Sequence, residues 1–227
     1  PRERVDLRQT LGPLGSRPHD PTFLWEGWDA WLPLRTPDGS ATLYLRAGDG
    51  IRVTAWGTGA EWALAAVPAL LGADDDWFGL DLGAYELLRE TRRRMPGLRL
   101  TSTARPFAAL VPSILEQKVT SLEALRSWRR LVTRFGEEPP GPAPLGMRVI
   151  PAAEVWKRIP SWEWHRAGVG PQRSATVVRA ASVADSLERC TTVSAEVAVS
   201  RLRSVAGIGA WTAAETVQRS HDSANHV

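Results

Sequence analysis

Cysteine is almost absent from this 227-residue chain, and so is any long apolar run. The single Cys190 excludes an internal disulfide and any cysteine-based metal site within these residues. No run of about 18 apolar residues is present, so the sequence predicts no membrane span. The first residues, Pro1 to Arg8, carry charges where a secretory signal needs an apolar core. We therefore expect a cytoplasmic protein.

Several catalytic signatures are missing as well. The sequence contains no serine nucleophile elbow, no P-loop and no dinucleotide fingerprint. The four histidines show no paired spacing with carboxylates or with Cys190 that would suggest a metal centre: His19, His165, His221 and His226. His165 follows Trp-Glu-Trp, and it fits either acid–base or stacking work or a structural place at a helix end beside packed aromatics.

Basic residues are distributed unevenly, although the net charge is only +3. Residues 1–100 carry 12 Arg against 14 acidic residues, which gives −2. Residues 101–227 carry 14 Arg and 2 Lys against 11 acidic residues, which gives +5. This excess slightly favours a nucleic-acid partner for the second half, and an ordinary solvated surface also explains it.

The first hundred residues predict a mixed domain of strands and helices. Segments 41–47 and 51–56 alternate apolar and polar residues at period two, with Gly48-Asp49-Gly50 as a hairpin turn between them. Segment 61–71 is apolar enough for a buried helix that ends at Gly72. Segment 82–95 predicts a second helix with an arginine-rich end.

From residue 101 onward the pattern is helical only, so we place a domain boundary between 1–100 and 101–227. Segment 106–119 has apolar residues at helical spacing and predicts an amphipathic helix. Thr120 and Glu123 form a capping box for a helix to Phe135 whose inward side includes Leu122, Leu125 and Leu131. A proline-rich linker follows at 138–145. Further helices are expected at 152–158, 171–187, 195–204 and 210–219.

The stretch from Leu202 to Glu215 joins two of these helices by a Gly-Ile-Gly turn. Gly207 and Gly209 permit a positive φ and a close approach to a bulky partner, and Ile208 would plug the turn into the protein. The helix that starts at Ala210 would offer free N–H groups and the positive end of its dipole to an anion. An ordinary turn between two helices, with glycine after the first, is the alternative.

The string Leu202, Val205, Gly207, Ile208, Gly209, Thr212 and Ala213 resembles the helix-hairpin-helix motif of the DNA glycosylase superfamily. Two other segments support the resemblance in the expected order. Ala109–Thr120 looks like the early helix with a Gln-x-Val-Thr end that faces DNA, and Ala167–Ala175 is similar to a Gly-x-x-x-x-Arg-Ala segment. The mixed first domain is similar to that of bacterial 3-methyladenine DNA glycosylases of type II.

This resemblance implies an α+β fold, with a small mixed antiparallel sheet and helix domain before an all-α helix-hairpin-helix glycosylase domain. It implies base-excision repair: a monomer acts on double-stranded DNA with a damaged, alkylated base. Ala210 and Thr212, with the Gly207–Gly209 turn, would bind the DNA backbone. A structural Na⁺ or K⁺ ion held by the main-chain carbonyls of Arg203, Val205 and Ile208 is the one bound group implied.

The resemblance also gives roles around the flipped base. Lys118, after Gln117, stands where a side chain fills the gap in the duplex, and a solvated helix end is an equal alternative. Trp211 stands where strand-cleaving relatives carry a nucleophilic lysine, which implies a monofunctional hydrolase; a core tryptophan is the alternative. Glu215 departs from the aromatic residue of the alkylpurine enzymes and leaves the choice of damaged base open.

The catalytic carboxylate is expected outside this sequence. The family places one Asp roughly 20 residues beyond the second hairpin glycine, which counts to a position just past Val227. Asp222 comes too early and lies in a polar stretch, so we do not assign it the role. We expect a C-terminally truncated chain that is inactive by itself and marginally stable. An iron–sulfur cluster, where relatives have one, would follow that Asp.

Two other functions remain open at this stage. The chain could be a helix-hairpin-helix module that binds double-stranded DNA without chemistry. It could also be an α+β protein that binds a small molecule or a protein and uses the Gly-Ile-Gly segment as a plain turn.

Overall fold

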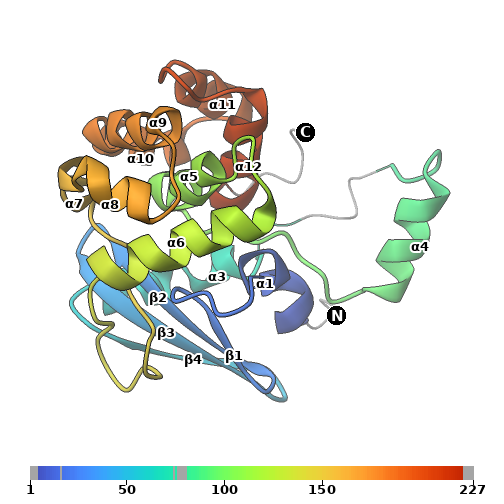
Figure 1. The fold of residues 1–227 in the computed structure, drawn as a ribbon. Helices are drawn as coiled ribbons and strands as arrows, with labels where there is room; N and C mark the ends of the chain where they lie inside the picture. The colour runs from blue at the N-terminus through green and yellow to red at the C-terminus, as the bar shows by residue number, and fades with distance from the viewer. Residues whose placement is uncertain (1–4, 16, 74, 76–80, 222–227) are drawn as a thin grey trace.

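A four-stranded antiparallel sheet and a cluster of helices make up the fold (Figure 1). In this computed structural model, residues 5–15, 17–73, 75 and 81–221 are described. The strands are β1 (Leu24–Glu26), β2 (Asp29–Thr36), β3 (Gly39–Ala47) and β4 (Ile51–Trp56), and they pair in the order β1-β2-β3-β4. The observed β3 and β4 confirm the two predicted strands, and β3 starts two residues earlier than expected.

The strands β1 and β2 and the helix α1 (Leu7–Gly15) were not predicted. Pro33 hides β2 in the sequence because proline is rare inside a sheet. The structure explains the exception: β1 pairs only with Asp29–Trp31, so one side of β2 is an open edge at Pro33. α1, α2 (Ala60–Ala65) and α3 (Val67–Leu70) supply the helical residues of a core with the sheet.

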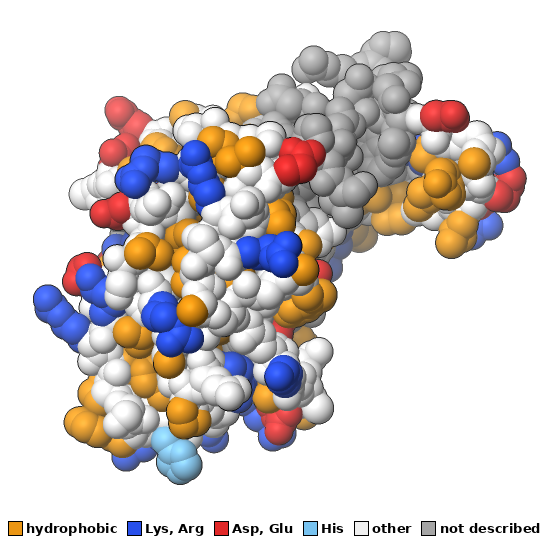
Figure 2. Space-filling view, turned by 90° about the horizontal axis from the view of Figure 1, so that it is seen from above, with side chains coloured by type: hydrophobic (Ala, Val, Ile, Leu, Met, Phe, Trp, Pro, Cys, Tyr) orange, Lys and Arg blue, Asp and Glu red, His pale blue; other side chains and the backbone are white. Residues whose placement is uncertain are grey.

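Two predicted helices of the first half are wrong in extent. The expected single helix at 61–71 is two helices that meet at Ala66, where Pro68 would interrupt a continuous ladder of hydrogen bonds. The expected helix at 82–95 is α4 (Glu86–Arg94), which starts four residues later. α4 buries no residue and stands away from the rest of the molecule (Figures 1 and 2).

The second half is helical, as predicted. Its helices are α5 (Pro106–Leu115), α6 (Ser121–Phe135), α7 (Ala153–Arg158), α8 (Ser161–Arg166), α9 (Pro171–Ser182), α10 (Ala184–Glu188), α11 (Ala195–Arg203) and α12 (Ala210–Ser220). The expected helix at 171–187 is wrong as one element, because Val183 leaves the helical conformation between α9 and α10. A short 3-10 turn at Arg189–Thr192 follows α10.

α5 lies at the centre of the helical core rather than at its surface. Every residue of α5 except Ala108 is buried, so the predicted amphipathic pattern is wrong there. The capping box of Thr120 and Glu123 is confirmed at the start of α6. Leu122 is 56% exposed and not inward as expected, because α6 turns Trp128, Leu131 and their neighbours to the core.

Three stacked tryptophans fill the helical core between α6, α7 and α8. The ring centroids of Trp128 and Trp156 are 6.4 Å apart, and those of Trp156 and Trp164 are 5.8 Å apart. This core contains only residues from 107 onward, whereas the core at the sheet contains only residues up to 71. The boundary near residue 101 stays a prediction. Within the described part of the chain, no helix is long and apolar enough to cross a membrane.

Candidate nucleic-acid interface

The Gly-Ile-Gly segment forms a tight turn between α11 and α12. The N–H of Ile208 donates to the carbonyl of Val205 at 3.0 Å, and Gly207 between them has φ +98°. Ile208 is 5% exposed, so it plugs the turn into the core as the sequence suggested. The left-handed conformation at Gly207 is one that residues with a Cβ rarely adopt.

The fold depends on the two glycines to different degrees. A Cβ at Gly207 would lie 2.2 Å from the Oγ1 atom of Thr176 in α9. Thr176 cannot easily move, because its hydroxyl donates to the carbonyl of Gln172 and accepts from Arg179. A Cβ at Gly209 would meet no atom within 4 Å, and Gly209 has an ordinary φ of −89°. The fold therefore requires glycine at position 207, whereas position 209 is an N-cap with open space beside it, where the fold does not require glycine.

The first turn of α12 presents unpaired backbone donors. Gly209 is the N-cap of this 11-residue helix, and no side chain caps it. Among the described residues, the first N–H groups, at Ala210 and Trp211, make no backbone hydrogen bond outside the helix. These groups lie at the positive end of the helix dipole, which is the arrangement that binds phosphate or another anion.

Gln117 connects the end of α5 to the hairpin. Its Nε2 atom donates to the carbonyl of Gly207 at 3.0 Å and to the hydroxyl of Thr212 at 2.9 Å. Thr212 is buried at 2% exposure, so its contribution is to hold this contact rather than to face solvent. The sequence placed Gln117 in the same site as the hairpin, and the structure brings them together.

Lys118 lies in a loop and not at a helix end, since α5 stops at Leu115. It is exposed and has φ +55°, a conformation that is uncommon for a residue with a side chain. Such strain is kept only where the surroundings fix the backbone. Here the backbone is fixed by the hydrogen bond of Gln117 on one side and by Thr120, the N-cap of α6, on the other.

Two arginines of α9 hold the same region together. Arg173 donates to the carbonyls of Leu115 at 2.7 Å and Gly168 at 3.0 Å, and burial lowers its pKa. Arg179 donates to the carbonyl of Ala206 in the hairpin at 2.8 Å. Sequence reasoning found the segment of Arg173 and missed Arg179, because nothing local in the sequence shows which helix packs against the turn.

These residues surround an open groove of about 1100 Å³, called the hairpin groove below. Its cationic lining residues are Lys118, Arg173 and Arg179, and no described carboxylate lines it. Trp211 also lines it and is 52% exposed, so the core-tryptophan alternative is wrong. A basic groove with an exposed aromatic ring and free backbone donors fits the phosphates and bases of a nucleic acid.

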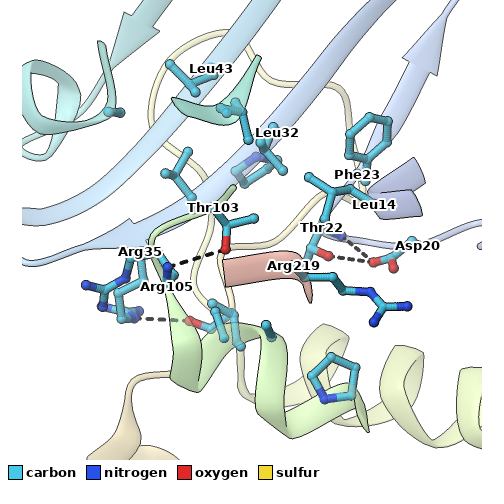
Figure 3. Close-up of a pocket in the computed structure, with 18 of the residues that line it drawn as sticks. Leu14, Asp20, Thr22, Phe23, Leu32, Arg35, Leu43, Thr103, Arg105 and Arg219 are labelled. Atoms are coloured by element: carbon cyan, nitrogen blue, oxygen red, sulfur yellow. Dashed lines mark hydrogen bonds between the residues drawn. The ribbon is translucent and has the colours of Figure 1, made fainter. Parts of the chain in front are cut away.

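Trp211, Glu215 and Arg219 follow one another at i, i+4 and i+8, so they share one side of α12. Glu215 is ion-paired with Arg219. Arg219 in turn lines a cavity of about 130 Å³ between the sheet and the helices, together with Arg35, Arg105 and Asp20 (Figure 3). This side of α12 therefore runs from the hairpin groove to the junction of the two cores.

Polar contacts tie the loop before β1 to the helices at this junction. Arg17 is ion-paired with Glu116 at 2.7 Å. Asp20 accepts the indole N–H of Trp128 at 3.0 Å as well as the amide and hydroxyl of Thr22 (Figure 3). Because Trp128 is in the centre of the helical core, this bond joins that core to the N-terminal segment.

Glu188 and Arg105 form a second, partly buried ion pair, and Arg105 lines the cavity. The carboxylate lies 3.3 Å from the guanidinium and accepts the N–H of Phe107 at 3.2 Å. Burial raises the pKa of Glu188 to about 7, although the charge of Arg105 lowers it. The pair is 20% and 15% exposed, respectively, and lies away from the hairpin groove residues.

The remaining candidates are placed apart from the groove. His165 is exposed in the last turn of α8, and its role stays untested. His221 is buried and bonded to Ser220 and to the carbonyl of Cys190, which the sequence did not reveal. Asp222 lies outside the described residues. No three His, Cys, Asp or Glu residues of the described ranges are grouped to hold a metal ion.

The expected cation site consists of three main-chain carbonyls in and before the hairpin. The carbonyl of Val205 accepts the N–H of Ile208 and keeps a second lone pair. In the described residues, no backbone donor outside the helices reaches the carbonyls of Arg203 or Ile208. The three carbonyls thus have acceptor capacity left for an alkali cation, which oxygen ligands suit.

No protein-family model and no curated protein matches this sequence. Solved structures do match it. The 3-methyladenine DNA glycosylase from Archaeoglobus fulgidus matches with a TM-score of 0.78 at 18% identity, over 95% of this chain and 76% of that chain. The 8-oxoguanine glycosylase/lyase from Clostridium acetobutylicum, in complex with double-stranded DNA containing cytosine opposite 8-oxoG, matches with a TM-score of 0.71 at 11% identity, over 95% and 73%. This chain therefore has the fold of these DNA glycosylases, and the expected fold class is confirmed.

Proposed function

We propose that this chain, which has the fold of DNA glycosylases, binds duplex DNA with a damaged base and is part of a monofunctional glycosylase that hydrolyses the N-glycosidic bond. The observation that carries the proposal is the hairpin itself. Its two glycines have no side chains that could cover the start of α12. Gln117 donates a hydrogen bond to the turn, and Thr176 lies close to Gly207.

In this proposal the N–H groups at Ala210 and Trp211 bind one backbone phosphate of the duplex. The carbonyls of Arg203, Val205 and Ile208 would hold a Na⁺ or K⁺ ion, whose positive charge would add attraction for that phosphate. Lys118 would enter the duplex where the target nucleotide has left the stack. Its exposure and fixed, strained backbone suit a side chain that projects from the surface.

The flipped base would meet the side of α12 that carries Trp211 and Glu215. The indole ring of Trp211 offers a stacking surface and no amine, so a Schiff-base step through this residue has no nucleophile. We therefore expect base release without strand cleavage. Borohydride treatment of the complete gene product on damaged DNA is expected to trap no covalent complex, and a trapped complex would contradict the monofunctional proposal.

Hydrolysis needs a carboxylate close to the sugar, where positive charge develops. Among the described residues, Glu215 is the acidic residue on this side of α12, and its carboxylate is already ion-paired with Arg219. The prediction of an Asp beyond Val227 therefore stands as part of the proposal. The lack of a described carboxylate in the hairpin groove also favours a second candidate, a double-stranded DNA-binding module without chemistry.

One experiment separates the two candidates. The complete gene product is incubated with methylated duplex DNA, and free bases are measured by chromatography; in parallel, binding to a duplex with an abasic-site analogue is measured by fluorescence anisotropy. Base release together with binding supports the glycosylase. Binding that weakens steeply with salt, without base release, supports the module. Absence of binding to any duplex refutes both.

A further inference from the structure

A second basic surface lies on α6 and α8, away from the hairpin. It is an open groove of about 920 Å³ lined by five arginines: Arg126, Arg129, Arg130, Arg134 and Arg166. Leu131, Phe135 and Ala167 also line it. Figure 1 shows α8 beside the end of α6, and Arg130 links the two by donating to the carbonyl of Arg166 at 2.9 Å. We call this the α6 arginine groove.

The charge of the α6 arginine groove is poorly compensated. The one carboxylate that lines it, Glu163, is buried and lies 2.8 Å from Arg134 and 3.3 Å from Arg166. Within the described structure, Arg126 and Arg129 make no hydrogen bond or ion pair. In α4, by contrast, Arg93 and Arg94 are both ion-paired with Glu90 of the same helix.

The spacing of these arginines costs the helix stability. Arg126, Arg130 and Arg134 are four residues apart, so like charges face each other along one side of α6. This row extends over about 12 Å, and one strand of a DNA duplex carries a phosphate for about every 3.4 Å of rise along the duplex axis. Backbone phosphates lying along this row would reduce the repulsion between its like charges.

The two grooves border the same part of the chain, since Val119 just before α6 lines the hairpin groove and Arg126 in α6 lines the α6 arginine groove. Hydrogen bonds from Thr120 lower the pKa of Glu123, and the nearby charges of Arg173 and Arg126 lower it further. Arg173 lines the hairpin groove and Arg126 lines the α6 arginine groove. The start of α6 therefore lies between the two basic surfaces.

We infer that the α6 arginine groove binds the backbone phosphates of the same duplex, on the part that flanks the damaged base. This inference rests on the proposed function, because the hairpin must fix the duplex first. The contact is with phosphates alone, so it adds affinity and salt dependence without adding sequence preference.

The test compares duplex lengths. Each duplex carries the same central abasic-site analogue, in a short form of about 12 base pairs and a long form of about 30, and binding is measured from about 50 to 200 mM salt. The variant R126Q/R129Q removes two arginines that form no hydrogen bond or ion pair among the described residues. We expect its slope of log K against log salt to fall by about 2 on the long duplex and to be unchanged on the short one.

The matched control is R46Q/R52Q, which removes the same charge from two exposed, facing arginines of β3 and β4. It should leave both slopes unchanged. Unchanged slopes for R126Q/R129Q on both lengths would overturn the inference while leaving the proposed function intact. An equal fall on both lengths would also overturn it, since these arginines would then act at the hairpin contact. A chain that binds neither length refutes the proposed function itself.

Discussion

Replacing each hairpin glycine by alanine distinguishes a glycine that stability requires from one that DNA binding requires. At Gly207 the new Cβ would lie 2.2 Å from the Oγ1 of Thr176, and φ +98° is strained for alanine. Backbone strain of about 1–3 kcal/mol and overpacking of about 1–3 kcal/mol together predict that Gly207→Ala lowers the free energy of unfolding by about 2–6 kcal/mol. Urea unfolding followed by tryptophan fluorescence measures this loss.

Gly209→Ala is the matched partner of that variant. No atom lies within 4 Å of its new Cβ, so the loss of stability should stay within about 1 kcal/mol, the cost of alanine at an N-cap. The added methyl group enters open space at the N-cap of α12, so on the proposed function DNA affinity should fall although the fold remains. Equal destabilisation by both variants would refute the account of Gly207, and wild-type DNA affinity in Gly209→Ala would refute the close approach of DNA.

Three further predictions concern contacts around the site. The pKa of Glu188 is about 7 in the fold against an ordinary value of 4.5, so folding takes up a proton between these values and the free energy of unfolding falls as pH rises through this window. This pH-dependent loss of stability is about 3 kcal/mol, and it can be measured by urea unfolding below and above the window. The Glu188→Gln variant should not show it, and a wild-type stability that rises over the window would contradict the prediction. Gln117→Ala should cost about 1–2 kcal/mol in unfolding and weaken DNA binding, because two hydrogen bonds to the hairpin are lost; unchanged affinity in anisotropy titrations would count against its role. Thr120→Ala should lower the melting temperature, because the loss of the α6 cap costs about 1 kcal/mol, and the Thr120→Ser control should retain most of the wild-type stability.

Local patterns predicted the elements whose boundaries are set locally. The capping box gave the start of α6, and period two gave β3 and β4. Contacts between distant segments could not be read in this way. The break between α2 and α3, the burial of α5 on nearly all sides and the edge position of Pro33 depend on what packs beside each segment.

The candidate site shows the same division. The hairpin glycines, Gln117 and the segment of Arg173 were found from their motifs. Thr176 and Arg179, which support the turn from α9, carry no local signal, since a threonine and an arginine in a helix are ordinary. The exposure of Trp211 was equally open, because 11 tryptophans in the sequence made a core position a reasonable alternative.

The two hydrogen bonds of Gln117 fix the distance between the Lys118 loop and the hairpin before any ligand arrives. On the proposed function, this rigidity means that the duplex and not the protein must bend to touch both. The energy of bending depends on how well the bases stack, and it is lowest where damage has already weakened stacking or pairing. A stiff protein surface would therefore select damaged sites by the mechanical softness of the DNA, before any atom of the damaged base is read.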